Sequence, residues 1–279
     1  MHSLQTKLYR VERLFCHCRE KLGGVRNNLK LTKNYKPGFF VNCSMLIAVM
    51  LVVQPLLVQK VWADTEIATV PVGDLPIQLK FSPANNNVYV ANTGSNTVSV
   101  ISSSNNNVIA TIPVGANPSA LEFSPANNAT INSTSTIYVV NSGSNTVSAI
   151  DSSNDVIATI PVGVGPFAIE FNEANKNIYV ANRGGSNSIS VIDGFDRRVI
   201  ATIPVDDIPI QLEFNEANKN IYVANFFSTI SVINSANDVI ATIPVGVGPE
   251  YLEFNPVNNN LYISLPLQDT VSVIATSAP

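Results

Sequence analysis

From residue 64 onward, short apolar segments alternate with clusters of Asn, Ser, Gly and Pro. Segments such as Thr97–Ile101 alternate apolar and polar side chains with period two and are rich in β-branched residues, a pattern typical of strands. Asn-rich turns such as 85–87 separate the segments. Sustained helical periodicity does not occur beyond residue 63. The pattern therefore predicts an all-β domain over residues 64–279.

This β-strand pattern repeats five times. Ile-Ala-Thr-Ile-Pro-Val occurs at 67–72 (with Val at 70), 109–114, 157–162, 200–205 and 240–245. Tyr-Val-Ala-Asn or a close variant occurs at 89–92, 138–141, 179–182 and 222–225, and it drifts to Tyr-Ile-Ser-Leu at 262–265. Each unit holds four strand-like segments, and four strands in about 40–45 residues are typical of a propeller blade. We predict a five-bladed β-propeller of four-stranded blades.

The ends of the repeat region predict how the ring closes. The region begins with a fourth-strand segment, Ile67–Val72, and ends with a third-strand segment, Thr270–Ala275. Pairing of these two segments would complete the last blade with the N-terminal strand. Each fourth-strand segment carries a Pro, which removes a ladder donor and is tolerated at the edge of a sheet. The fourth strand is therefore expected at the outer edge of each blade.

The first 63 residues have a different composition. Residues 1–38 form a basic leader, since residues 1–44 hold nine Lys and Arg against two Asp and Glu. An apolar stretch at 39–58 and the small residue Ala63 follow, so 39–63 is predicted to be a signal peptide or, alternatively, a membrane anchor. Met45 is an alternative start. Either export segment predicts a secreted or cell-surface protein, with membrane contact only through 39–58 if it is not cleaved.

Charge and cysteine content narrow the chemistry of the repeat domain. Residues 64–279 hold six Lys and Arg against eighteen Asp and Glu, which excludes a nucleic-acid partner. All three Cys and both His precede residue 64, so the domain has no thiol nucleophile, no imidazole base and no His or Cys metal ligand. The Cys16-His17-Cys18 triplet lacks a second ligand pair at the spacing of a zinc finger. Phosphate-binding Gly loops and redox motifs are also absent, so no organic cofactor is expected.

The recurring tetrapeptide and its flanking segments resemble the YVTN-family β-propeller repeat, named for Tyr-Val-Thr-Asn. The resemblance covers about residues 64–279, with Ala or Val in place of the Thr. It implies a surface-layer or secreted protein. Members of that family commonly have seven blades, whereas this chain has five copies. The resemblance is specific for fold and assigns no activity.

Each first strand carries one charged residue, and first strands line the channel of a propeller. These residues are Lys80, Glu122, Glu170, Glu213 and Glu253. Clustered carboxylates raise one another's pKa and can hold a hard cation such as Ca²⁺. They can also act as an acid and base pair in glycoside chemistry. The third interpretation is a solvated channel wall, or carboxylates that accept hydrogen bonds from backbone donors.

Two faces of the propeller carry other candidates. The face of the second-to-third-strand loops is expected to hold a binding surface of Arg183, Asp206, Asp207, Phe226 and Phe227. Paired aromatic side chains there either anchor a partner or pack between blades. The opposite face carries an insertion at 127–136 with two glycosylation sequons, at Asn128 and Asn132.

These observations predict a non-catalytic extracellular or cell-surface module that binds a protein, a carbohydrate or an envelope component, or that serves a structural role. The alternative is a hydrolase or lyase that uses the channel carboxylates. The absence of His leaves general base work to carboxylates alone, which argues against an enzyme.

Overall fold

The computed structural model describes residues 65–126 and 134–276, and the chain from Glu66 onward forms one unit. All regular elements in these ranges are strands, and they form five antiparallel sheets. The first sheet consists of β1 (Pro76–Ser82), β2 (Asn87–Asn92), β3 (Thr97–Ser102) and β4 (Val108–Pro113). The second sheet consists of β5 (Pro118–Ser124), β6 (Thr136–Asn141), β7 (Thr146–Asp151) and β8 (Val156–Pro161). The third sheet consists of β9 (Pro166–Phe171), β10 (Ile178–Asn182), β11 (Ser188–Ile192) and β12 (Val199–Pro204). The fourth sheet consists of β13 (Pro209–Phe214), β14 (Ile221–Asn225), β15 (Thr229–Ile233) and β16 (Val239–Pro244). The last is β17 (Leu252–Asn255), β18 (Asn260–Leu265), β19 (Thr270–Ala275).

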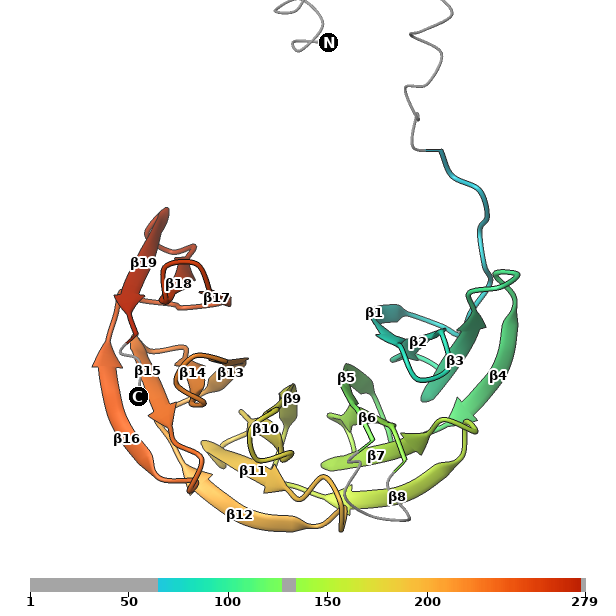
Figure 1. Ribbon diagram of the computed structural model, residues 1–279, viewed down its shortest axis with the longest axis horizontal. Coiled ribbons are helices and arrows are strands. Elements are labelled where there is room, and N and C mark those ends of the chain that lie inside the picture. The colour runs from blue at the N-terminus through green and yellow to red at the C-terminus, as the bar shows by residue number, and fades with distance from the viewer. Residues whose placement is uncertain (1–64, 127–133, 277–279) are drawn as a thin grey trace, which may run out of the picture. The chain divides into compact units, whose positions relative to one another are not determined.

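The five sheets follow one another along an arc in the manner of propeller blades (Figure 1). The first strand of each sheet (β1, β5, β9, β13 and β17) lies on the inside of the arc, where each of these strands contacts the next. The fourth strands, β4, β8, β12 and β16, lie on the outside. The arrangement is therefore that of a β-propeller.

The sequence pattern predicted the strands of each sheet well. The alternating segment Thr97–Ile101 is β3, and the four later copies of the Ile-Ala-Thr-Ile-Pro marker are the outer strands. Their prolines stand at the exposed end of each outer strand, where a missing N–H donor breaks no ladder. Asn86 and Asn106 adopt positive φ angles of 55° and 56° in the turns, as expected for Asn.

The predicted closure of the ring does not occur in the structure. Residues 67–72 form no strand, and the last sheet has the order β17-β18-β19 without a fourth strand among the described residues. The first and the last sheet lie at opposite ends of the arc (Figure 1). The physical reason is the packing between sheets, because five sheets packed as they are here occupy only part of a circle.

The hydrophobic core consists of four apolar clusters, one at each junction between neighbouring sheets. At the first junction, Val98 and Val100 of β3 meet Leu121 of β5 and Ile137 of β6, and all four are almost fully buried. Burial of one such side chain contributes about 1.5–3 kcal/mol. Each sheet is thus held mainly by the sheets next to it in the arc.

A tyrosine hydroxyl reinforces three of these junctions by reaching a turn of the next sheet. Each tyrosine comes from the recurring Tyr-Val-Ala-Asn segment in the second strand of its sheet. The bonds run from Tyr89 to Asn154 Oδ1 (2.8 Å), from Tyr138 to Gly194 O (3.2 Å) and from Tyr179 to Asn237 Oδ1 (2.6 Å). The phenol group thus gives the repeated tyrosine a structural role that phenylalanine could not fill.

Several sequence predictions concern residues outside the described ranges. The leader and the apolar stretch, both within residues 1–63, and the sequons at Asn128 and Asn132 lie there. Among the residues that the structure describes, no helix has the length and apolar character needed to cross a bilayer.

Replacing Tyr179 by Phe should destabilise the domain by about 1 kcal/mol, because Asn237 then loses its hydrogen-bond donor at a packed junction. Tyr262→Phe is the matched control, since Tyr262 occupies the same position in the last sheet and, among the described residues, accepts its hydrogen bond from Asn258 of its own sheet. We expect the control to change the free energy of unfolding by less than about 0.5 kcal/mol. Urea denaturation of both variants measures the difference, and equal effects would refute the role of the cross-sheet bond.

Candidate functional site

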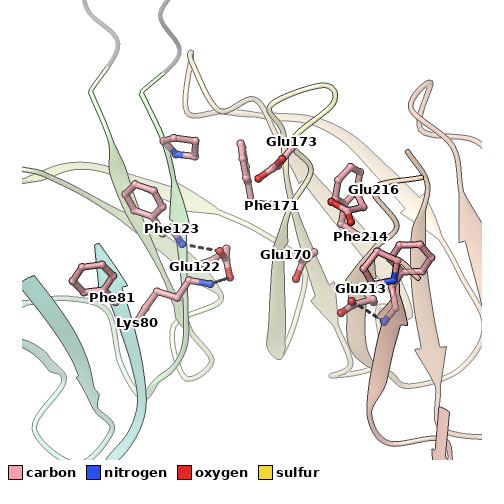
Figure 2. A pocket seen from close by; sticks show the side chains of 13 residues that line it. Lys80, Phe81, Glu122, Phe123, Glu170, Phe171, Glu173, Glu213, Phe214 and Glu216 are labelled. Atoms are coloured by element: carbon pink, nitrogen blue, oxygen red, sulfur yellow. Dashed lines mark hydrogen bonds and ion pairs between the residues drawn. The ribbon is translucent and has the colours of Figure 1, made fainter. Parts of the chain in front are cut away.

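The inner strands bring four of the five predicted channel residues to one cavity. Each charged residue lies opposite the repeated tyrosine of its sheet, as Glu170 lies opposite Tyr179. The cavity has a volume of about 490 Å³, and it is lined by Lys80, Glu122, Glu170 and Glu213 (Figure 2). Glu253, the fifth predicted residue, is exposed and does not line it. The predicted ring is therefore a partial one.

Lys80 and Glu122 form an ion pair between the first two sheets. The distance from Lys80 Nζ to Glu122 Oε2 is 2.6 Å. The other carboxylate oxygen of Glu122 accepts a 2.9 Å hydrogen bond from the backbone N–H of Phe123. Burial raises the pKa of Glu122, while the charge of Lys80 and these hydrogen bonds act in the opposite direction. Glu122 is thus the carboxylate of the cavity with a cation as its direct partner.

Glu170 stands between Glu122 and Glu213 (Figure 2). Burial raises the pKa of Glu170 well above the usual range, and the negative charges of Glu122 and Glu213 raise it further. Lys80 lowers the pKa of Glu170 by a smaller amount. Both causes shift Glu170 toward the protonated form, in which a carboxyl group both donates and accepts hydrogen bonds.

Glu213 links the fourth sheet to the fifth. Its Oε1 atom accepts a 3.1 Å hydrogen bond from the backbone N–H of Phe254 on β17. Burial raises the pKa of Glu213 to about 7; the hydrogen bond from Phe254 lowers it and the charge of Glu253 raises it. At the other end of the arc, Gln78 Oε1 makes the corresponding contact with the backbone N–H of Leu121 at 2.6 Å. The interpretation that channel carboxylates accept bonds from backbone donors is thus correct for Glu213.

Sequence reasoning missed the aromatic part of the cavity. One phenylalanine of each inner strand lines it, directly after the charged residue: Phe81, Phe123, Phe171, Phe214 and Phe254. The signal was present, because this phenylalanine recurs in all five repeats. Two further acidic residues, Glu173 and Glu216, line the cavity from the turns that follow β9 and β13. The cavity therefore combines an acidic surface with apolar aromatic rings.

A phenylalanine of this cavity already has a cation near its ring. Lys176 Nζ lies 5.7 Å from the ring centroid of Phe171, within the range of a cation–π interaction.

A metal site was also predicted for the channel. In 65–126 and 134–276, no group of three or more His, Cys, Asp or Glu side chains is arranged to hold a metal ion. A Ca²⁺ ion at the channel carboxylates remains a prediction of the sequence.

Of the five residues predicted for the binding surface on the loops, only Arg183 and Phe226 line a common cavity. Arg183 and Phe226 line a cavity of about 300 Å³ at the loops that join β10 to β11 and β14 to β15. The Arg183 guanidinium lies 3.4 Å from the ring centroid of Phe167, a cation–π contact within the third sheet. Phe226 and the more exposed Phe227 meet edge to face at 5.6 Å.

The two aspartates predicted for this surface have structural partners instead. Asp206 Oδ2 accepts a 2.7 Å hydrogen bond from the hydroxyl of Thr229, and Asp207 Oδ1 accepts a 2.6 Å bond from Asn187 Nδ2. Neither aspartate lines the cavity that contains Arg183. Their hydrogen bonds connect neighbouring loops of the third and fourth sheets.

Known protein families and curated proteins give no match to this sequence. Solved structures do match. The hydrazine synthase of Kuenenia stuttgartiensis has a TM-score of 0.61 at 20% identity, over 77% of this chain and 67% of that one. A proposed 6-phosphogluconolactonase from Bacteroides uniformis has 0.60 at 16%, over 74% and 68%. Dihydro-heme d1 dehydrogenase NirN has 0.58 at 18%, over 75% and 45%. At such identities the likeness supports the propeller fold alone.

Glu213→Gln should change how stability depends on pH. The raised pKa of Glu213 means that the folded state favours the neutral form, so its contribution is full below pH 4.5 and is lost as the pH rises through about 7. The amide of the variant does not titrate and keeps an oxygen for the Phe254 N–H. We expect the variant to gain about 1 kcal/mol relative to the wild type between pH 4.5 and 8, after allowance for solvent screening.

Thermal melts of both proteins across this pH range measure the effect, which corresponds to a change of about 2–4 °C in the difference of their Tm values. A difference that stays constant with pH would show that Glu213 is ionised in the folded protein throughout.

Proposed function

We propose that this chain is a non-catalytic binding module, secreted or held at the cell surface, whose cavity on the inner strands binds a carbohydrate. The observation that carries the proposal is the composition of that cavity. An open cavity of about 490 Å³ is lined by a row of glutamates, one lysine and five phenylalanines, of which Phe171 and Phe254 are mostly buried in the junctions. Binding sites for small molecules typically combine apolar and aromatic walls with a few polar groups that set orientation.

The chemistry of a sugar matches both parts of this lining. Its hydroxyl groups need donors and acceptors, which a protonated Glu170, the Glu122 carboxylate and the Lys80 ammonium offer together. Its C–H faces need apolar contact, which the accessible phenylalanines Phe81, Phe123 and Phe214 offer. Because the pKa of Glu170 is raised, a neutral ligand can displace water from this site at a lower desolvation cost than three full negative charges would impose.

A hydrolase or lyase at the same cavity is the second candidate. It is favoured by the different environments of two carboxyl groups: Glu122 is paired with Lys80, whereas Glu170 is buried near other carboxylates. Such a difference separates an acid from a base in glycoside chemistry. Residues 64–279 contain no His, so both proton transfers would depend on carboxyl groups.

Three finer statements belong to the same proposal. The chain is a YVTN-type repeat protein of five blades, which the five Tyr and Pro markers support. It is exported, which the apolar stretch at 39–58 after a basic leader supports. Its surface is glycosylated at Asn128 and Asn132 if the host modifies such sequons.

Screening the full-length protein against a glycan panel, followed by calorimetric titration of the best glycan, tests the proposed function. Glu170→Ala should weaken binding at least about tenfold, since alanine can neither donate nor accept a hydrogen bond in place of the carboxyl group. Glu253→Ala is the matched control because Glu253 holds the same strand position but lies outside the cavity. Its affinity should stay within about twofold of the wild type.

Equal losses in the two variants would place the glycan elsewhere, and no binding to any glycan would refute the carbohydrate assignment. Release of a shortened glycan that stops in Glu170→Ala would instead establish the hydrolase or lyase.

A further inference from the structure

The first sheet leaves uncovered a face that is covered in all later sheets. Leu79 of β1 is 61% exposed, whereas Leu121 of β5 and Leu212 of β13, at the same position of their strands, are 1% exposed. Ile77 on the same face of β1 is also exposed. In the later sheets this face packs against the preceding sheet, and the first sheet has no preceding sheet in the arc.

The last sheet leaves the opposite face uncovered. Val271 and Val273 of β19 are 59% and 50% exposed, whereas Val98 and Val100 of β3, at the same positions, are 0% exposed. In the earlier sheets this face packs against the following sheet. The protein thus carries two different apolar faces, one at each end of the arc (Figure 1).

Faces equivalent to these two pack against each other at all four junctions of the chain. At the first junction, Val98 and Val100 pack against Leu121, and at the third, Ile189 and Val191 pack against Leu212. The face at Ile77 and Leu79 is the counterpart of Leu121 and Leu212. The face at Val271 and Val273 is the counterpart of the valine pairs. A fifth junction of the same kind is therefore available between the two ends.

The missing outer strand points to the same contact. Residues 66–72 repeat the outer-strand sequence but form no strand, while β19 has no outer partner among the described residues. The segment that leads into β1 has the same hydrogen bond and backbone conformation as the segment that joins β4 to β5. The N–H of Thr93 donates to Leu75 O at 3.0 Å, as the N–H of Ser142 donates to Asn117 O at 3.0 Å. Leu75 and Asn117 also share a positive φ, at 52° and 51°.

A register for the new strand pair follows from the existing sheets. In the first sheet, Ser99 pairs with Thr111 and Val98 with Ile112. Transfer of this register to the last sheet pairs Ser272 with Thr69, and Val271 with Val70.

We propose that the two ends join between copies of this chain, head to tail: the first sheet of one copy packs on the last sheet of another, and residues 66–72 of the former supply the fourth strand of the latter. A single chain could make this contact with itself only by changing the packing at its junctions, because its five sheets occupy part of a circle as packed (Figure 1). Contact between copies leaves every junction as it is. Such a heterologous contact builds rings or open chains of subunits.

Two variants of the full-length chain in mild detergent, each blocked at one end, test the proposal. Ile77→Glu with Leu79→Glu charges the first-sheet face, and Val271→Glu with Val273→Glu charges the last-sheet face. All four side chains are exposed, so the fold should persist, as circular dichroism will verify. In sedimentation experiments the wild type should form dimers or larger assemblies and each variant should be a monomer. An equal mixture should form a dimer that grows no further, since only one compatible contact remains.

A cysteine pair placed in the same two variants tests the strand register. In a background with Cys16, Cys18 and Cys43 replaced by Ser, Thr69→Cys goes into the variant that is blocked at its last sheet. Ser272→Cys goes into the variant that is blocked at its first sheet. The mixture should form a disulfide-linked dimer. Ser104→Cys, on the exposed turn after β3, replaces Ser272→Cys as the control and should not link.

Three results would overturn the proposal. These are a wild type that is monomeric at every concentration, association that survives when both faces are charged on one chain, and a disulfide that forms within a single chain carrying both Thr69→Cys and Ser272→Cys. The last result would show that the ring closes on itself.

Discussion

The packing of one sheet against the next is the interaction on which the rest of this protein depends. Each sheet has four strands at most and two apolar faces, so it cannot bury its side chains alone. The four junction clusters bury them in pairs, and tyrosine hydroxyls add a polar contact at three junctions. The inner strands are brought together by the same packing. The cavity that they line is therefore a product of the junctions and belongs to no single sheet.

Local features of the sequence predicted the strands correctly, but they did not predict the curvature of the arc. Strand positions follow from period-two alternation, and the outer edge follows from proline, because both depend on backbone chemistry within one sheet. The curvature of the arc depends instead on how side chains of different volume interlock between sheets. The sequence of one repeat does not display that geometry. For this reason the strand marker at 67–72 was recognised, but the predicted pairing of this segment with β19 of the same chain is absent from the structure.

The candidate site shows a similar division. Counting one charged residue per repeat predicted that Lys80, Glu122, Glu170, Glu213 and Glu253 gather in one place, and all but Glu253 line the cavity. Their differences could not be predicted in this way. Whether a carboxyl group meets a lysine, a backbone N–H or other carboxyl groups depends on its neighbouring sheet. Glu122, Glu213 and Glu170, respectively, have these three environments.

The chain-like order of the sheets has a consequence for local unfolding. A sheet inside the arc is stabilised by two junctions and a sheet at an end by one, so the free energy of opening should be lowest at both ends and highest in the middle. Amide hydrogen exchange would then be fastest in β1–β4 and β17–β19 and slowest in β9–β12. Glu170 lies on β9, in the middle sheet. A carboxyl group whose pKa is raised by burial thus sits where thermal fluctuations open the structure least.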